Sequence, residues 1–325
     1  MADLSTCYLG LNLKNPLIIA ASGLTSTVEG VRKAAASGAG AVVLKSLFEE
    51  QLRAELAEAE ASVEGAHPEA AAFLRKAGMD EGARDYLALI KGAKAEGLPI
   101  IASLNCVSAH NWGEFAGRIA EAGADALELN VGLLPASLEE RGSVIEDRLF
   151  EAVREAKRSS NLPLAVKLGS NWSSLANVAQ ELGKIGASGL VLFNRFYRLD
   201  ADLGSLALKA GSVRSSGDEF HESLRWISIL YDRVPCDLAA SSGVHDAEAA
   251  LKLIAAGARA VELCSVIYKR GFGVVGEIAR AMGERLDADG RKGVNELRGK
   301  LAQWKSADPT AYLRLQYIQA LTGIS

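Results

Sequence analysis

Two lysines stand at the ends of two short apolar runs, and they are the first candidates for chemistry in this sequence. Lys45 closes the run 41–45, and Lys167 closes the run 162–167. Burying an unpaired ammonium group is costly, so a lysine at a buried strand end is expected to face a negative group. Two such lysines on one face favour an anionic ligand. The alternative is that each side chain extends along the protein surface to water.

Two segments rich in small residues could bind a phosphate group. One follows the apolar run 236–240 and the other follows the run 260–264. Small residues let the backbone approach a ligand closely and direct its N–H groups at it. Ser242, Gly243 and Ser265 are the candidates, for either a flavin phosphate or a sugar phosphate. The alternative is that these residues only make tight turns.

Apolar runs of this kind recur along the chain, and helical spacing of Ala, Leu and Ile separates them, which predicts parallel βα units. The expected strands are 17–21, 41–45, 99–104, 126–130, 163–168, 189–194, 236–240 and 260–264. Eight such units favour a closed (β/α)₈ TIM barrel with its active site at the carboxyl ends of the strands. An open doubly wound sheet is the alternative, but the GxGxxG fingerprint expected after its first strand is missing.

The sequence predicts a single α/β domain over residues 1–325, with several features beyond the barrel. Residues 4–15 are expected to form an N-terminal hairpin near a turn at 14–16. Long loop excursions follow the second strand (46–82) and the sixth strand (195–218), where they could cover a site or meet a partner subunit. Glycine is expected to close four helices in the left-handed conformation. These are Gly38, Gly123, Gly186 and Gly257. Two C-terminal helices, about 272–287 and 291–304, should pack on the outside.

Composition narrows the class of protein. The net charge of −4 over 325 residues indicates no general attraction to nucleic acid or to an anionic membrane. No apolar run is long enough to span a bilayer, and the first residues lack a signal-peptide pattern, so a cytoplasmic protein is expected. The four cysteines are widely spaced, which predicts reduced thiols and neither a protein-held metal nor an iron–sulfur cluster of its own.

Seven stretches occur in the order found in one known family. They are 15–23, Lys45-Ser46, Glu128-Leu129-Asn130, Val166-Lys167-Leu168, Asn194, Ser242-Gly243-Val244 and Cys264-Ser265. With them the chain resembles the dihydroorotate dehydrogenases, particularly the soluble class 1 branch, over most of the barrel. The resemblance implies bound FMN, a role in pyrimidine biosynthesis and a homodimer.

The resemblance also implies roles for individual residues. Flavin contacts are expected from Ala21, Ser22, Gly23, Lys45, Ser46, Asn130, Lys167, Asn194, Ser242, Gly243, Cys264 and Ser265. Lys45 would reach both flavin and substrate, and Lys167 would lie at the N1/C2 edge, where a fixed cation favours the reduced anion. Asn130 and Asn194 would also bind the substrate, unless they only cap strand ends.

The match fails on the substrate side. Where the family has a Ser-Cys-Pro-Asn loop after the fourth strand, this chain has Leu133 at the position of the catalytic base and Pro135 at the position of the asparagine. The excursion after the second strand lacks the family's Gly-Leu-Pro-Asn segment. Arg195 replaces a small hydroxyl residue after Asn194. It could hold a substrate carboxylate in bidentate fashion or form a surface salt bridge.

Proton transfer would therefore need another residue. Cys106, Ser137 and His67 are the candidates, although a buried inert thiol is the simpler interpretation of Cys106. A general base must come within hydrogen-bond reach of the proton that it removes.

The favoured function is an FMN-dependent oxidoreductase that acts on a C–C bond next to a carbonyl, with dihydroorotate as the default substrate. One alternative is a flavin barrel with a different substrate, or a non-catalytic electron-relay subunit. Another is a phosphate-binding aldolase or isomerase that uses Lys45 or Lys167. The expected partners are a small carbonyl or carboxylate compound and an external electron-transfer protein, with no nucleic acid and no membrane.

Overall fold

A parallel barrel forms the centre of the computed structural model, which describes residues 1–50, 83–106, 109–195 and 198–314. Its strands are β3 (Leu17–Ile19), β4 (Ala41–Val43), β6 (Ile100–Asn105), β7 (Ala126–Asn130), β8 (Leu164–Leu168), β9 (Gly189–Leu192), β12 (Asp237–Ala240) and β13 (Ala260–Leu263). They are hydrogen-bonded in chain order, and the pairings of β13 with β3 and of β4 with β6 close the ring. The predicted TIM barrel is confirmed.

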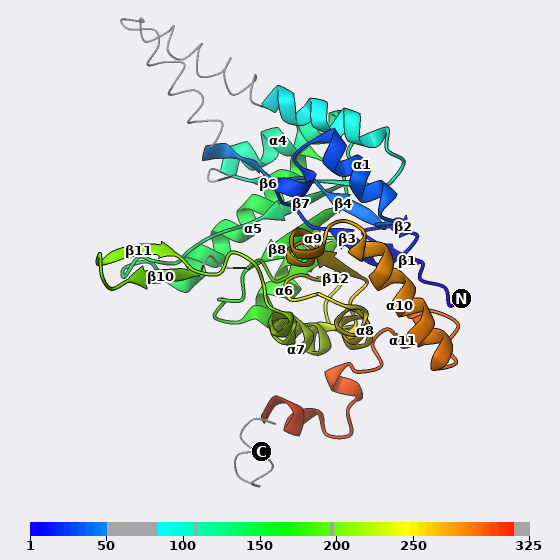
Figure 1. Ribbon diagram of the computed structural model, residues 1–325. Helices are drawn as coiled ribbons and strands as arrows, with labels where there is room; N and C mark the ends of the chain where they lie inside the picture. Colours follow the sequence, from blue (N-terminus) through cyan, green and yellow to red (C-terminus); the bar gives the residue numbers. More distant parts are fainter. Residues whose placement is uncertain (51–82, 107–108, 196–197, 315–325) are drawn as a thin grey trace, which may run out of the picture.

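Helices surround the barrel (Figure 1). The longer ones are α1 (Val28–Ala36), α4 (Ala109–Glu121), α5 (Gly142–Ser159), α6 (Leu175–Lys184), α7 (Phe220–Leu230), α8 (Ala247–Ala256) and α10 (Val274–Ala288). The four predicted closing glycines all have positive φ, between 87° at Gly38 and 136° at Gly257. No helix in the described part of the chain is long and apolar enough to cross a membrane.

The N-terminal hairpin closes the amino-terminal end of the barrel. It pairs β1 (Thr6–Tyr8) with β2 (Leu11–Leu13), and its turn lies at Leu9-Gly10 rather than at the expected 14–16. Leu9 and Gly10 have φ of 54° and 74°, the two left-handed residues that a tight hairpin turn needs. Asn15 instead joins two segments, because its side chain donates to the Gly38 carbonyl and accepts from the Leu17 amide.

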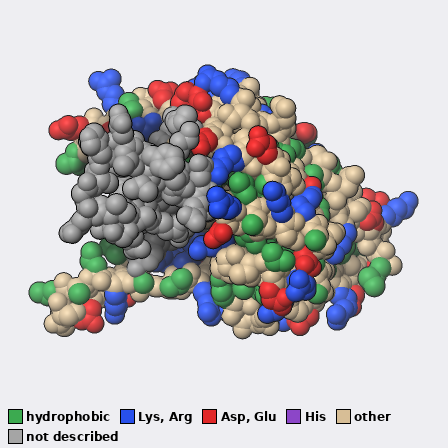
Figure 2. All heavy atoms as spheres, turned by 90° about the horizontal axis from the view of Figure 1, so that it is seen from above, with side chains coloured by type: hydrophobic (Ala, Val, Ile, Leu, Met, Phe, Trp, Pro, Cys, Tyr) green, Lys and Arg blue, Asp and Glu red, His purple; other side chains and the backbone are tan. Residues whose placement is uncertain are grey.

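The two excursions differ in what can be described. Only the start of the first is described, where the short strand β5 (Leu47–Phe48) pairs with β6; the rest, including His67, lies outside the described residues. The second contains an exposed hairpin of β10 (Leu199–Asp202) and β11 (Ala207–Ala210) that projects from the body (Figure 1). Hydrophobic side chains are visible along this arm in Figure 2.

The C-terminal part partly departs from expectation. The prediction of a helix at about 272–287 is confirmed by α10, but the prediction of a second helix at about 291–304 is wrong. That region has only the short helix α11 (Val294–Leu297) and a 3₁₀ turn, Gln303–Lys305. Gly299 interrupts it with φ of 67°, and a Cβ there would overlap the Tyr231 ring, so the chain must turn at this point.

Candidate active site

Three charged side chains meet inside the carboxyl-terminal half of the barrel. Lys167 on β8 lies with its Nζ 2.5 Å from Glu262 Oε2 and 3.6 Å from Glu128 Oε1. Glu128 comes from the neighbouring strand β7, and Glu262 comes from β13. All three side chains are buried. We call Lys167, Glu128 and Glu262 the charged triad.

Burial and mutual repulsion change the protonation of the triad. Burial, and then the nearby charge of Glu262, raise the pKa of Glu128 well above that of an ordinary glutamate. Burial alone would lower the pKa of Lys167, but the attraction of both carboxylates outweighs it and the pKa is raised. The ammonium group is therefore held protonated, beside one carboxyl group that retains its proton more strongly than usual.

The sequence interpretation singled out Lys167 but missed its two partners. Each lies inside an apolar run, Ala-Leu-Glu-Leu-Asn for Glu128 and Ala-Val-Glu-Leu-Cys for Glu262. Glutamate is almost never fully buried unless it is paired. That rule, applied to both runs together with Lys167, is the signal that could have found the triad.

Lys45 has a different environment from Lys167. Strand β4 ends at Val43, so Lys45 lies beyond the strand and its side chain is exposed. The next residue, Ser46, is buried, and its hydroxyl lies 2.8 Å from the hydroxyl of Ser103 on β6. Both lysines lie at the carboxyl ends of their strands, as expected, but only Lys167 is enclosed by the barrel.

An amide pair lies beside the triad. Asn194 Nδ2 donates to Asn130 Oδ1 at 2.8 Å, and Asn130 is the register partner of Lys167 across β7 and β8. Within the described part of the chain, the Asn130 side-chain nitrogen makes no hydrogen bond. Both asparagines are half-buried, so their remaining amide groups can reach a ligand at this end of the barrel.

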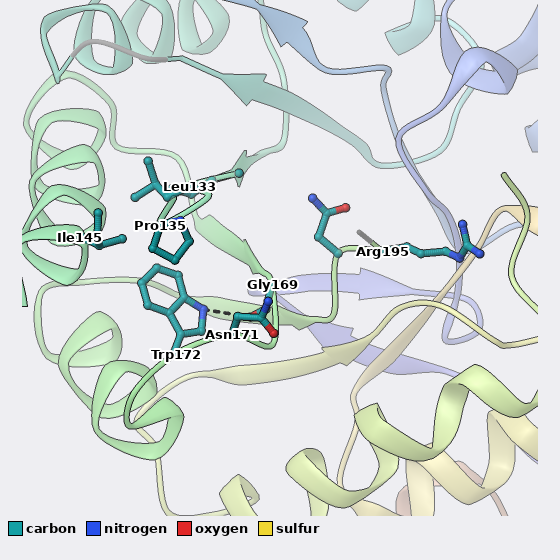
Figure 3. A pocket seen from close by; sticks show the side chains of 10 residues that line it. Leu133, Pro135, Ile145, Gly169, Asn171, Trp172 and Arg195 are labelled. Atoms are coloured by element: carbon teal, nitrogen blue, oxygen red, sulfur yellow. Dashed lines mark hydrogen bonds between the residues drawn. The ribbon is translucent and has the colours of Figure 1, made fainter. Parts of the chain in front are cut away.

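Arg195 is engaged by the protein itself. Its Nε donates to Glu219 Oε2 at 2.9 Å, and Arg198 lies 3.2 Å from the other oxygen of that carboxylate. The Arg195 side chain is mostly buried, and its guanidinium points away from the apolar pocket in Figure 3. The ion pair matches the salt-bridge alternative, although it is more enclosed than a surface contact.

The two loops proposed for phosphate lie next to each other and to the second excursion. Ser242 and Gly243 have φ of 72° and 73°, and a Cβ on Gly243 would lie 2.2 Å from the Phe220 amide nitrogen. Ser265, at the start of α9 (Ser265–Arg270), accepts a hydrogen bond from the Ser215 amide at 2.9 Å. The sequence interpretation missed this contact, because Ser215 lies fifty residues earlier in an irregular segment.

Ser215 is fixed by further contacts at this end of the barrel. Its hydroxyl lies 3.1 Å from His245 Nε2, and its carbonyl accepts from Lys269 Nζ at 2.8 Å. Burial, with the nearby charge of Lys269, lowers the pKa of His245.

The segment 21–23 has a compact local structure. The Ser22 hydroxyl donates to the Ala20 carbonyl and accepts from the Leu24 amide. A Cβ on Gly23 would lie 2.9 Å from the Tyr268 hydroxyl. The Ser22 side chain lies near the Cys264 thiol, whose pKa is raised, chiefly by burial. Ala21, Ser22 and Cys264 are therefore close to one another beside the barrel mouth.

A cavity of about 220 Å³ lies between the loops that follow β7, β8 and β9. Its wall is largely apolar, and Leu133, Pro135, Ile145 and Trp172 gather on one side (Figure 3). The Trp172 indole donates to the Gly169 carbonyl at 2.9 Å, which fixes the ring. The residues at the two altered positions of the loop after β7 thus form part of an apolar wall.

The alternative bases are less well placed than their sequence positions suggested. Cys106 is buried in the main hydrophobic core. Ser137 is exposed, and its hydroxyl accepts from the Glu139 amide within the same loop. Among the described residues, His, Cys, Asp and Glu side chains form no group that could hold a metal ion.

Comparison with known proteins gives a consistent result. A sequence model of the family "Dihydroorotate dehydrogenase" matches residues 3–286. Three relatives are each described as "Dihydroorotate dehydrogenase B (NAD(+)), catalytic subunit". The protein from Pyrococcus abyssi is 27% identical over 89% of this chain and 96% of its own length. The protein from Thermoplasma acidophilum is 26% identical over 92% of this chain and 99% of its own length. The protein from Methanosarcina mazei is 29% identical over 89% of this chain and 92% of its own length.

These matches confirm the resemblance inferred from the sequence and the predicted class of enzyme, an oxidoreductase of this type. The chain belongs to the dihydroorotate dehydrogenase family.

Proposed function

We propose that the chain is one FMN-binding domain that oxidises or reduces a C–C bond next to a carbonyl group, with dihydroorotate as the first substrate to test. The observation that carries this proposal is the convergence of the amide pair, the charged triad and the left-handed Ser242–Gly243 turn at one end of the barrel. Family membership supports it. When bound, FMN would supply the hydride acceptor or donor.

The side chains at the barrel mouth fit a flavin. Asn130 and Asn194 offer amide groups to the carbonyl and nitrogen atoms of a flavin ring, and Ala21, Ser22 and Gly23 allow close backbone approach. Ser242, Gly243, Cys264 and Ser265 would lie at the phosphate end, and Lys45 and Ser46 at the opposite rim. The buried Gly243, which has no room for a Cβ, keeps the turn tight enough for backbone N–H groups to face a phosphate.

The substrate side favours a second candidate within the same reaction class. Leucine cannot remove a proton, and Leu133 forms an apolar wall with Pro135 and Trp172. A cavity with this wall suits a carbonyl compound that carries an apolar group better than it suits a small polar ring acid. Such a substrate would still use the amide pair for its carbonyl oxygen.

The charges argue against an imine-forming aldolase that uses Lys167. An amine must lose its proton before it attacks a carbonyl, and the two carboxylates raise the pKa of Lys167. Lys45 is exposed and is not part of the charged triad, so borohydride trapping at Lys45 is the result that would favour an aldolase or isomerase.

Three finer features belong to the proposal. We place the protein in the cytoplasm as a homodimer, and we expect an external electron-transfer partner. The relatives' description as catalytic subunits supports a partner. Size measurement in solution and co-purification with a flavin reductase subunit would test the assembly.

The direct test begins with the colour of the purified protein. We expect a yellow protein with one bound FMN, and bleaching when dihydroorotate is added without oxygen. Asn130→Ala should weaken FMN retention, whereas Asn295→Ala, at an exposed site on α11, should not. A colourless protein that stays colourless after incubation with FMN would overturn the proposal. A second outcome would favour the apolar substrate class. In it, dihydroorotate does not bleach the yellow protein, but cyclohexenone reoxidises the flavin after it has been reduced chemically.

A further inference from the structure

The charged triad contains one cation and two carboxyl groups, so its net charge depends on one proton. If both carboxyl groups are ionised, the triad has a charge of −1, and if they hold one proton it is neutral. The contacts are unequal, since Lys167 Nζ is 2.5 Å from Glu262 and 3.6 Å from Glu128. Among the described residues, Glu128 Oε1 accepts no hydrogen bond. The 3.6 Å ion pair with Lys167 compensates this buried oxygen less well than a hydrogen bond would, which favours the protonated form.

The crowding of the two carboxyl groups points to the same proton. Glu128 and Glu262 both contact the Lys167 ammonium group, and all three side chains are buried. Two carboxyl groups that share one buried site do not both ionise readily, because their like charges repel. Among the described residues, the other titratable groups within electrostatic reach of the triad are Tyr8 on β1, Tyr86 and the Cys264 thiol. Burial raises the pKa of all three, so all three are neutral and add no charge.

We infer that Glu128 and Glu262 share one proton and together cancel the charge of Lys167, so that the charged triad has no net charge when flavin is bound. The inference rests on the proposed FMN function. A free cation under the flavin would stabilise the reduced anion and raise the midpoint potential. Because the triad is neutral, it raises the midpoint potential much less than a free cation would. Glu128 and Glu262 act as positioning residues that set the net charge around Lys167 and the orientation of its side chain.

Single and double Glu→Gln substitutions test whether the two carboxyl groups share a proton, because each substitution changes the net charge of the triad in a different way under the two alternatives. In Glu128→Gln or Glu262→Gln the remaining carboxylate still neutralises Lys167, so each single variant should keep its flavin potential. In the double variant Lys167 alone remains charged. In mildly acidic buffer we expect its two-electron reduction constant to rise at least tenfold, about 30 mV. The exposed Glu277→Gln serves as the matched control.

The outcomes separate the alternatives. Single variants that each shift the potential by about half of the double variant's shift would show that both carboxyl groups are ionised, and would overturn the inference. A double variant with an unchanged potential would also overturn it, because the triad would then not act on the flavin.

A measurement that needs no flavin keeps the inference testable if the double variant does not fold. A shared proton means that the folded chain binds one more proton than the unfolded chain above the pKa of an ordinary glutamate. The free energy of unfolding should then fall as pH rises from about 4.5 towards neutrality. Each single variant should lose this part of the pH dependence, whereas Glu277→Gln should keep it. The same curve in wild type and single variants would overturn the inference, and an absent flavin would overturn the proposed function alone.

Discussion

The two halves of the barrel interior are built from the same strands but have opposite chemistry. In the amino-terminal half of the barrel, which we call the lower layer, the inward residues of β7, β8 and β13 are Ala126, Ala165 and Ala260. The carboxyl-terminal half is called the upper layer. Two positions further along each strand stand Glu128, Lys167 and Glu262. Successive inward residues on a strand are two apart, so one step along three strands changes an apolar layer into a charged one.

The lower layer explains how the barrel can contain the upper one. The three alanines leave room for Tyr8, Leu9 and Leu13 of the N-terminal hairpin, which fill the space as one buried cluster. Burying charged groups usually lowers stability, even when they are paired. We infer that the apolar layer contributes to stability and the charged layer to function. Each prediction below tests this division.

The largest effect should come from Lys167→Met. Removing the cation leaves two buried carboxyl groups without a counter-charge, and breaking a buried ion pair destabilises proteins by about 3–5 kcal/mol. Denaturant unfolding at neutral pH would measure the loss, which should shrink in acid as both carboxyl groups become protonated. Lys184→Met, at an exposed ion pair on α6, should change stability by less than about 1 kcal/mol. Equal effects at the two sites would show that removal of the Lys167 ammonium group leaves no uncompensated buried charge.

The two lysines show what the sequence could and could not predict. Apolar runs and helix-closing glycines predicted the strand order, because burial and backbone conformation are local requirements. Lys45 and Lys167 read alike in sequence, yet β4 ends two residues before Lys45 whereas β8 continues beyond Lys167. Strand length depends on pairing with neighbours, which a single run does not reveal. The contact of Ser265 with Ser215 depends on the path of a long excursion, so no local pattern could predict it.

A core substitution in the lower layer should affect stability alone. Leu13→Ala removes a fully buried side chain from the hairpin, and such changes cost about 2–5 kcal/mol. Thermal or denaturant unfolding would record this loss, while the flavin potential of the folded variant should stay at the wild-type value. Leu208→Ala, on the exposed arm, is the control and should leave stability nearly unchanged. A shifted potential in Leu13→Ala would contradict the separation of the two layers.

The smallest effect should come from Tyr8→Phe, at the boundary between the layers. The Tyr8 ring belongs to the apolar cluster, and its hydroxyl, which has no hydrogen-bond partner among the described residues, is within electrostatic reach of both glutamates. An unsatisfied buried hydroxyl is itself unfavourable, so its removal should leave the free energy of unfolding unchanged or raise it by up to about 1 kcal/mol. A loss of more than about 1 kcal/mol would mean that the hydroxyl donates to a carboxylate of the triad. The hairpin would then hold part of the charged layer in place, and the two halves of the interior would be one coupled unit.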